Sequence, residues 1–567
     1  MITSYYQQQL AYLRDLGTLL AKKHPALVPM LAGQSGDPDV ERLLEGTAFL
    51  SGLVQERLDD NFPEIIHSLT ELIFPHYLRP LPAAAIVRFT PKPSLQEPLL
   101  VPAGTELAAR EIDGVQAKFT TCDELNLLPL RIQRLETSER AIHIDLQLSG
   151  MSWQQLAQPR LRFYLSDEYH QAADRLALLN QSLCWVHVVN GDQRITLPAC
   201  EAFDGLVMQD QVPLYPYPAQ AFSACQSLQE YFQLPQKFLF FDLLGWPSNR
   251  LTGEQLTLVL ELASNSMPLS KHWKLELFCV PVVNLFSHHA ETILVDHTSS
   301  EYRINPSGGA DYQVYAVDRV VGFQQGSMQE RIYQPFTLVN PQVAATPVYS
   351  VRRRAAKLDH GTEAYLSVAY PEPSLALSQE TLVIQVRCTN TMELAQQLRY
   401  GDIGVATDSS PVMADFSNIT TLSPPVTAPL GGNLLWRLLS HLYVNQRSLA
   451  DQSALVALLK LYLFPDTSDR SGLLANTKRV EAIRDLFVDS SHKRLYRGAL
   501  IRGTAIRIRL DPEGFPCLGD RFLFCAVLDR LLSAYSTINS YTQVTIETTD
   551  DHWSFTWPAR AGKRHLL

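Results

Sequence analysis

The sequence lacks the short motifs that mark common catalytic, nucleotide-binding and metal-binding sites. It has no GxxxxGK(S/T) phosphate loop, no GxGxxG, GxSxG or HExxH motif and no EF-hand loop. Its eight cysteines include no CxxC pair, the spacing typical of zinc knuckles and dithiol redox sites. We therefore predict no catalytic residue, no cofactor and no bound metal.

Signals for export or membrane insertion are also missing. The N-terminus, MITSYYQQQL, has neither the basic residues nor the apolar run of a secretory signal. No stretch reaches the ~18 uncharged apolar residues of a membrane-spanning helix, and the best candidate, ALVALLKLYLF (454–464), contains Lys460. We expect a cytoplasmic protein with free thiols. Four cysteines in apolar runs are expected to be buried: Cys184, Cys279, Cys388 and Cys525.

Positive charge is scarce and scattered. The chain has 48 Lys and Arg residues against 58 Asp and Glu residues, a net charge of −10. Nucleic-acid binding needs clustered positive charge, so this composition argues against it. The one dense basic run, Arg352 to Arg354 followed by Lys357, is interpreted as a solvated or partner-facing patch.

The N-terminal region, residues 1–80, is rich in helical periodicity. Residues 4–23 predict a helix whose apolar side chains cover an arc of about 180°, wider than the stripe of about 100° that a helix lying on its own domain needs. Gln9 lies inside this arc and could set the register of packing. We predict a partner interface here, with the alternative that helices of the same chain cover the arc. The predicted interface residues are Tyr5, Tyr6, Gln9, Leu10, Tyr12, Leu13, Leu16, Leu19 and Leu20.

Two further helices are expected before residue 80. Asp37 is a predicted N-cap, with Pro38 at the first helical position, for a helix that continues to LDD (58–60). The next helix is expected to begin at Asn61 and Glu64, whose spacing is that of a capping box. The acidic stretch LDDNFPE (58–64) is therefore interpreted as helix capping rather than as a metal site.

The rest of the chain predicts a multidomain α+β protein. Short alternating segments separated by Pro, Gly and Asn indicate a β-rich domain over 81–300 and a second over 301–430, ending in a linker at 409–432. Residues 431–567 predict a C-terminal α+β domain. Its expected elements are helices at 433–464, 474–489 and 520–538 and strands at 494–510, 541–548 and 552–557.

The densest group of possible ligands is HHAETILVDH, residues 288–297. Alternation along a strand would place His289 and Glu291 on one face and His288 and Asp296 on the other, so a metal site that also used His297 fits poorly. We favour a surface turn followed by a strand.

Several stretches together resemble the TssF family, also called ImpG or VasA, of bacterial type VI secretion systems. They occur in order along nearly the whole chain, and none carries a chemical group at catalytic spacing. PSGGADYQ (306–313) and NQRSLA (445–450) depart from the family pattern. The matching stretches are YLRDLGTLLAKKHPAL, DPDVERLLEG, LDDNFPE, LIFPHYLRP, LPQKFLFFDLLGW, PVVNLFSHHAETILVDHTSSEYRINP, YAVDRVVG, GGNLLWRLLSHL and GDRFLFCAVLDRLLSAYSTINSYTQV.

The resemblance implies a structural protein similar to the wedge proteins of contractile phage-tail baseplates. It implies direct assembly with TssG and a second TssF copy, with TssK through TssG, and with TssE, the VgrG spike and the sheath. Such a wedge docks on the cytoplasmic face of the inner-membrane complex and starts sheath polymerisation. Two alternatives remain: a subunit of a true phage tail, and a cytoplasmic carbohydrate-active hydrolase.

The resemblance also directs attention to the C-terminal domain. Apolar residues cover more than half of the predicted helix at 520–538. We predict that this domain takes part in contacts between copies of the chain. The alternative for the helix itself is burial between its own sheet and the 433–464 helix.

Overall fold

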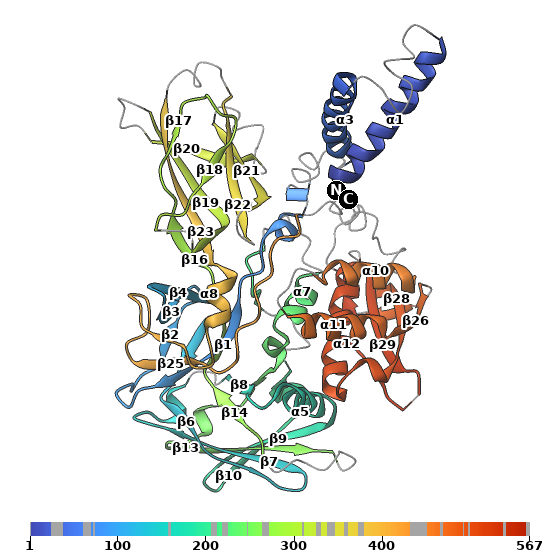
Figure 1. Cartoon of the computed structure of the whole chain (residues 1–567). Helices are drawn as coiled ribbons and strands as arrows, with labels where there is room; N and C mark the ends of the chain where they lie inside the picture. Colours follow the sequence, from blue (N-terminus) through green and yellow to red (C-terminus); the bar gives the residue numbers. More distant parts are fainter. Residues whose placement is uncertain are drawn as a thin grey trace. The chain divides into compact units, whose positions relative to one another are not determined.

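The chain is divided into two units in the computed structural model (Figure 1). They are Met1–Ile73 with Leu430–Leu439, and Phe74–Pro429 with Ser440–Leu567. The first unit contains helices, and all described strands belong to the second. The structure describes residues 2–23, 38–59, 70–71, 74–156, 160–205, 212–217, 225–246, 248–263, 272–308, 311–324, 330–336, 346–356, 361–371, 379–430, 451–464, 469–490, 493–496, 499–536, 540–550 and 552–562.

The first unit is built on two helices that contact each other, α1 (Ile2–Lys23) and α3 (Pro38–Asp59). Helix α3 begins at Pro38, as the sequence predicted, because the missing N–H of proline costs nothing in the first turn. An ion pair of 2.6 Å joins Arg14 of α1 to Glu41 of α3. The three predicted capping residues, Asp37, Asn61 and Glu64, lie outside the described residues.

Six of the described strands form a sheet that curls until its two outer strands, β24 and β25, touch. Asn418 makes the closure: its side chain accepts from the Ile403 N–H at 3.0 Å, and its carbonyl accepts from the Gly401 N–H at 3.2 Å. The strands are, in sheet order, β24 (Ile403–Val405), β3 (Glu106–Ile112), β4 (Val115–Thr121), β15 (Cys279–Val283), β1 (Ala84–Pro91) and β25 (Ala414–Asn418).

This sheet corrects the expected linker at 409–432. β25 lies inside that range and pairs with β1, and Val426 bridges to Leu81. Prolines and serines do mark turns there, but the short strand between them is stabilised by a partner more than three hundred residues earlier. Such pairing leaves no local signal in the sequence.

Two antiparallel sheets follow, with helices α5 (Tyr169–Ser182) and α7 (Gln226–Gln233) in the same part of the chain. Neither helix was predicted in this β-rich region. The first sheet holds β10 (Gln193–Pro198), β9 (Leu183–Asn190), β13 (Gln255–Leu262), β7 (Ala141–Leu148) and β6 (Leu130–Thr137). The second holds β11 (Phe203–Asp204), β12 (Phe240–Leu243), β8 (Leu161–Leu165) and β14 (Leu275–Leu277), and a separate pair is formed by β2 (Leu99–Val101) and β5 (Leu125–Leu127).

Eight described strands form a β-barrel between residues 286 and 390. The sheet path runs from β16 to β18, and its ends are joined by the bridge between Ala290 and Pro306. Leu366, Leu382 and Ile384 are among the fully buried residues of its core. The strands are β16 (Phe286–His289), β17 (Ile293–Val295), β18 (Tyr302–Ile304), β19 (Tyr312–Gln324), β20 (Glu330–Pro335), β21 (Val348–Ala355), β22 (Thr362–Ala369) and β23 (Glu380–Asn390).

The predicted domain boundary at residue 300 therefore does not separate the strands. β16 and β17 precede residue 300 but pair with β23, while β24 and β25 follow it but belong to the earlier six-stranded sheet. The barrel is inserted between strands of the six-stranded sheet, and the chain returns after it to complete that sheet with β24 and β25. Alternation within each strand was visible in the sequence, but the choice of partner strand was not.

The C-terminal part has a sheet with helices packed on it, and two predicted elements are corrected. The helix expected at 474–489 is helix α11 (Arg470–Glu481) followed by strand β26 (Ile483–Asp489), and the long strand expected at 494–510 is two strands. β28 and β29 are parallel and are connected through α12. The remaining elements are α10 (Gln452–Leu461), β27 (Lys493–Tyr496), β28 (Ala499–Leu510), α12 (Leu518–Ala534), β29 (Ser540–Thr548), β30 (Ser554–Thr556) and β31 (Arg560–Ala561).

Helix α12 is enclosed on all sides. Every residue from Gly519 to Leu532 is buried, and the helix contacts α5, α7 and β29. The alternative considered from the sequence, that this helix is buried within its own chain, is therefore right. The helices that cover it include α5 and α7 from the middle of the chain. Short helical segments elsewhere are η2 (Pro75–Leu78), η3 (Trp153–Gln155), α6 (Ala199–Ala202), η6 (Pro235–Phe238), η7 (Ser248–Arg250), α8 (Met392–Gln397) and η12 (Pro512–Gly514).

Candidate interaction surface

The predicted interface on α1 divides into a half-buried and an exposed part. Among the predicted residues, Tyr12, Leu16 and Leu20 are 60%, 42% and 45% exposed. Their spacing of four places them in one stripe along the helix. The half-buried residues of the arc are Tyr6, Gln9, Leu10 and Leu13. The side chains of Tyr5 and Leu19 lie outside the described part of the structure.

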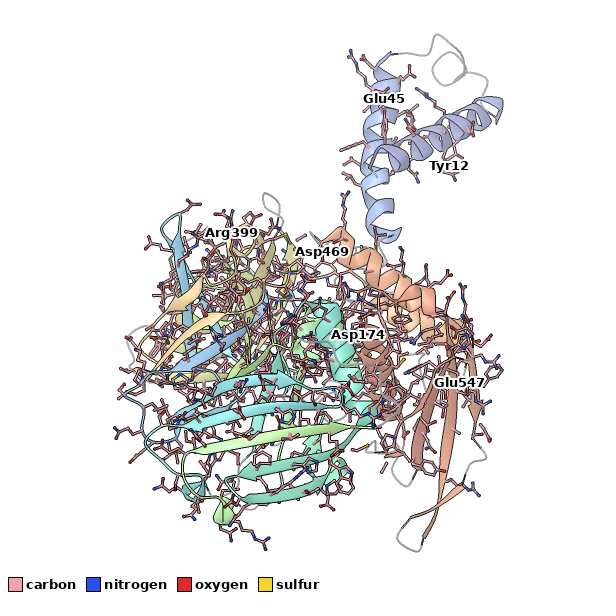
Figure 2. All side chains as sticks on the ribbon, turned by 90° about the horizontal axis from the view of Figure 1, so that it is seen from below. Tyr12, Glu45, Asp174, Arg399, Asp469 and Glu547 are labelled. Atoms are coloured by element: carbon pink, nitrogen blue, oxygen red, sulfur yellow. The ribbon has the colours of Figure 1, made fainter. Side chains whose placement is uncertain are left out.

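A second apolar stripe lies on α3, and the sequence reading did not separate it from the helix's other apolar residues. Leu43, Leu50 and Val54 are 71%, 65% and 60% exposed, whereas Ala48 is fully buried. At 100° per residue these three side chains centre about 140° from Ala48. Their spacing of seven and four residues was the signal that could have revealed the stripe. Figure 2 labels Tyr12 on α1 and Glu45 on α3.

The histidine-rich segment is occupied by structural contacts. His288 lies on β16, and its Nε2 is 2.5 Å from the Ser307 carbonyl oxygen. Asp296 accepts a hydrogen bond from the Thr298 N–H at 3.1 Å, and this bond holds the pKa of its carboxyl below the ordinary value. Within the described ranges no group of three or more His, Cys, Asp or Glu side chains is placed to hold a metal ion.

The arginines of the basic run are bound within the chain, and only Arg354, 44% exposed, is largely solvated, which narrows the sequence interpretation. The run lies in β21, where alternation turns Arg353 inward, and its guanidinium donates to the Tyr315 carbonyl at 2.8 Å. Arg352 and Arg354 point outward and both bind Glu301, at 2.9 and 2.5 Å. Lys357 lies outside the described residues.

The thiols follow the sequence expectation in three of four cases. Cys279, Cys388 and Cys525 are buried, and burial raises the pKa of each thiol. Cys184 is exposed, because it occupies an outward position near the start of β9. Trp185 beside it is also 45% exposed, whereas Val186, His187 and Val188 are buried, so only the start of this apolar run lies outside the core.

Two cavities in the second unit are lined by paired charges. The first, about 350 Å³, lies between α7, α11 and residues 421–426 and includes Arg479. The second, about 420 Å³, includes Arg162 and Lys237. Arg162 binds Asp242 at 3.0 Å, and Lys237 binds Glu230, so the cations there are neutralised inside the protein. Such pairs stabilise geometry more readily than they perform chemistry.

These features define a class. A helical unit with two exposed apolar stripes, joined to several sheets whose cavity-lining cations are paired within the chain, is typical of a structural subunit that assembles with other chains. In the described parts of the chain, no helix combines the length and the apolar character needed to cross a membrane. A family model described as "Type VI secretion system, TssF" matches residues 1–564, and the chain belongs to this family. It is a baseplate component of the type VI secretion system.

The similarity to known proteins extends over nearly the whole length of this chain and of each relative. The type VI secretion system component TssF1 of Pseudomonas aeruginosa is 27% identical over all of this chain and 99% of its own length. A chain in the cryo-electron microscopy structure of the TssK–TssF–TssG baseplate subcomplex is 25% identical, with a TM-score of 0.75 over 92% of this chain and 99% of that one. A chain in a structure of the type VI baseplate complex, 23% identical with a TM-score of 0.63 over both full lengths, shares the fold.

Proposed function

We propose that this chain is a wedge-core subunit that binds a TssG-like subunit directly and pairs with a second copy of itself. TssK joins through the TssG-like subunit, and the completed wedges surround a VgrG spike and, with TssE, start sheath polymerisation. The wedge docks at the cytoplasmic face of the inner-membrane complex. The chain performs this role without catalytic residues or a cofactor. The similarity to a chain of the TssK–TssF–TssG subcomplex supports the TssG-like and TssK-like partners.

The observation that carries the proposal is the pair of exposed apolar stripes on α1 and α3. Together they expose six large apolar side chains: Tyr12, Leu16, Leu20, Leu43, Leu50 and Val54. Burying apolar area is worth about 25 cal/mol per Å², or roughly 1.5–3 kcal/mol for a whole Leu side chain. A bundle shared with helices of other subunits would bury both stripes. In that bundle Gln9, half-buried within the α1 arc, would set the register.

The test replaces exposed residues only. Leu13 belongs to the half-buried part of the arc, so changing it would disturb the chain itself. Tyr12→Asp combined with Leu16→Asp should leave the isolated chain's thermal unfolding unchanged. It should weaken binding to the TssG-like subunit by about 3 kcal/mol or more, over 100-fold, because two carboxylates would be buried at the interface.

A matched control adds the same charge on the opposite face of α1. Gln7→Asp with Ala11→Asp changes two exposed residues that lie outside the apolar arc. Each variant is co-expressed with the TssG-like protein encoded beside it, and the complexes are counted by native mass spectrometry. Normal assembly of the Tyr12 and Leu16 variant would remove the shared-bundle proposal.

We further propose that the C-terminal domain contributes to contacts between copies through the open face of its sheet. Parallel strand pairs are usually covered on both faces, yet the outer side of β28 carries Arg507, 61% exposed. Phe487 of the neighbouring β26 is 55% exposed on the same side. Phe487→Asp in the full chain should lower the fraction of complexes that contain two copies, measured by native mass spectrometry. An unchanged fraction would exclude this face.

A further inference from the structure

The first turn of α12 meets the middle of the chain at unusually short range. The Gly519 N–H donates to the Asp174 carboxylate of α5 at 2.6 Å (Figure 2 labels Asp174). A Cβ placed on Gly519 would lie 2.0 Å from the backbone carbonyl carbon of Ala173. Only glycine permits this approach, because the atoms in the way belong to the α5 backbone rather than to a side chain that could turn aside.

The next residue, Asp520, joins four helices. Its side chain is fully buried and accepts from the Tyr169 hydroxyl of α5 at 2.6 Å and from the Tyr231 hydroxyl of α7 at 2.8 Å. Arg479 of α11 donates to the same carboxylate from Nε at 2.8 Å and from Nη2 at 3.1 Å. The carboxylate therefore accepts two hydrogen bonds from the middle of the chain and two from the C-terminal domain.

The three donor side chains of the network keep their protons around neutral pH. Burial raises the pKa of both tyrosines well above the ordinary value, so both remain hydroxyl donors. Burial lowers the pKa of Arg479, but Tyr231 and Asp520 outweigh that effect and raise it overall, so the guanidinium stays charged.

A buried ion pair of this kind adds little net stability, because removing both charges from water costs about as much as their attraction returns. Apolar contacts already hold α12 in place: Phe524 packs on the Tyr231 ring with centroids 6.0 Å apart. Apolar packing tolerates more than one arrangement, whereas four directional hydrogen bonds on one carboxylate tolerate a single arrangement.

We propose that Gly519 and Asp520 form an orientation lock: they fix the C-terminal domain in one position against α5 and α7, and the apolar contacts provide the adhesion. The lock makes the second unit a rigid body across this junction. The inference follows from contacts within the chain and does not depend on the proposed partners.

The test is Asp520→Asn in the full-length protein. Spin labels are attached through an unnatural amino acid at Arg194 and Ser554, two exposed positions on β10 and β30. The wild type should give one narrow distance distribution and the variant a broad one. Amide exchange in α5 and α7 should become roughly 10- to 100-fold faster, the effect of losing about one charged hydrogen bond, while β28 and β29 stay protected.

Asp511→Asn is the matched control, because Asp511 forms an exposed ion pair with Arg484 in the same domain. It should keep the narrow distribution. A narrow distribution in Asp520→Asn would overturn the proposal. If Asp520→Asn instead loses protection throughout β28 and β29, the pair Tyr169→Phe and Tyr231→Phe decides, since it removes two donors and keeps both rings. Broadening in that variant supports the lock, and an unchanged width refutes it.

Discussion

Replacing Gly519 by alanine has two opposing effects on the free energy of unfolding: a gain from helix propensity and a loss from packing. Alanine is about 1 kcal/mol more favourable than glycine in a helix interior, and this is the upper limit of the gain at Gly519 in the first turn of α12. At Gly519 the new Cβ would lie 2.0 Å from the carbonyl carbon and 2.3 Å from the carbonyl oxygen of Ala173, and 2.2 Å from the Asp174 nitrogen. Contact distances of about 3.5 Å would require α12 and α5 to separate by roughly 1.5 Å.

That separation breaks hydrogen bonds as well as relieving the clash. The bond from Gly519 to Asp174, 2.6 Å long, would exceed bonding distance, and a hydrogen bond to a charged group is worth about 1.5–3 kcal/mol. Overpacking costs a further ~1–3 kcal/mol. After the ~1 kcal/mol gained from propensity, Gly519→Ala should lower the free energy of unfolding by about 2–5 kcal/mol.

Calorimetry of the full-length protein measures this change. Gly46→Ala in α3 is the control, because a Cβ there meets nothing within 4 Å and the residue is exposed in a helix interior. It should stabilise its own unit by up to about 1 kcal/mol. If Gly519→Ala also raised the transition temperature, the close approach of α12 to α5 would be refuted.

Three further substitutions test other parts of the fold. Burial raises the pKa of Asp529 from 3.8 to about 6, so between those pH values the folded state keeps a proton that the unfolded state has lost; relative to Asp529→Asn, the wild type should therefore lose roughly 2.5 kcal/mol of stability as pH rises from 4 to 7 in denaturant titrations. Asn418→Ala should cost about 2–4 kcal/mol, seen as faster amide exchange in β24, because it leaves the buried Ile403 N–H without its acceptor. Glu380→Ala should cost about 3 kcal/mol and lower the barrel's melting temperature, since Arg331 and Tyr333 lose their buried partner; a loss under 1 kcal/mol would contradict that view.

Local structure could be predicted from this sequence because local patterns determine it. The strand expected at 541–548 agrees with β29 (Ser540–Thr548) to within one residue, and the helical arc of α1 was readable from spacing alone. The error at 474–489 has a physical cause: residues 483–489 form a strand because β28 pairs with them, and an isolated window contains no information about that partner. The insertion of a barrel between β15 and β24 was invisible for the same reason.

The candidate surface was predictable in part. The α1 interface residues followed from the width of one apolar arc, and it remains a prediction that other subunits bind there. The α3 stripe needed the structure, because only the burial of Ala48 shows which side of that helix is already used. The contacts of Gly519 and Asp520 needed it even more, since Tyr169 and Tyr231 lie some three hundred residues earlier in the chain.

The closure of the six-stranded sheet by β25 has a consequence for biosynthesis. β1 is synthesised more than three hundred residues before its outer partner β25, which begins at Ala414 and ends at the closing Asn418. Until that segment leaves the ribosome, β1 presents an unpaired edge next to fully buried residues such as Ile86 and Val87. The long sequence separation makes this sheet slow to complete and leaves nascent chains open to aggregation. A fragment that ends before residue 414 would therefore keep this edge exposed and should aggregate more readily than the full chain.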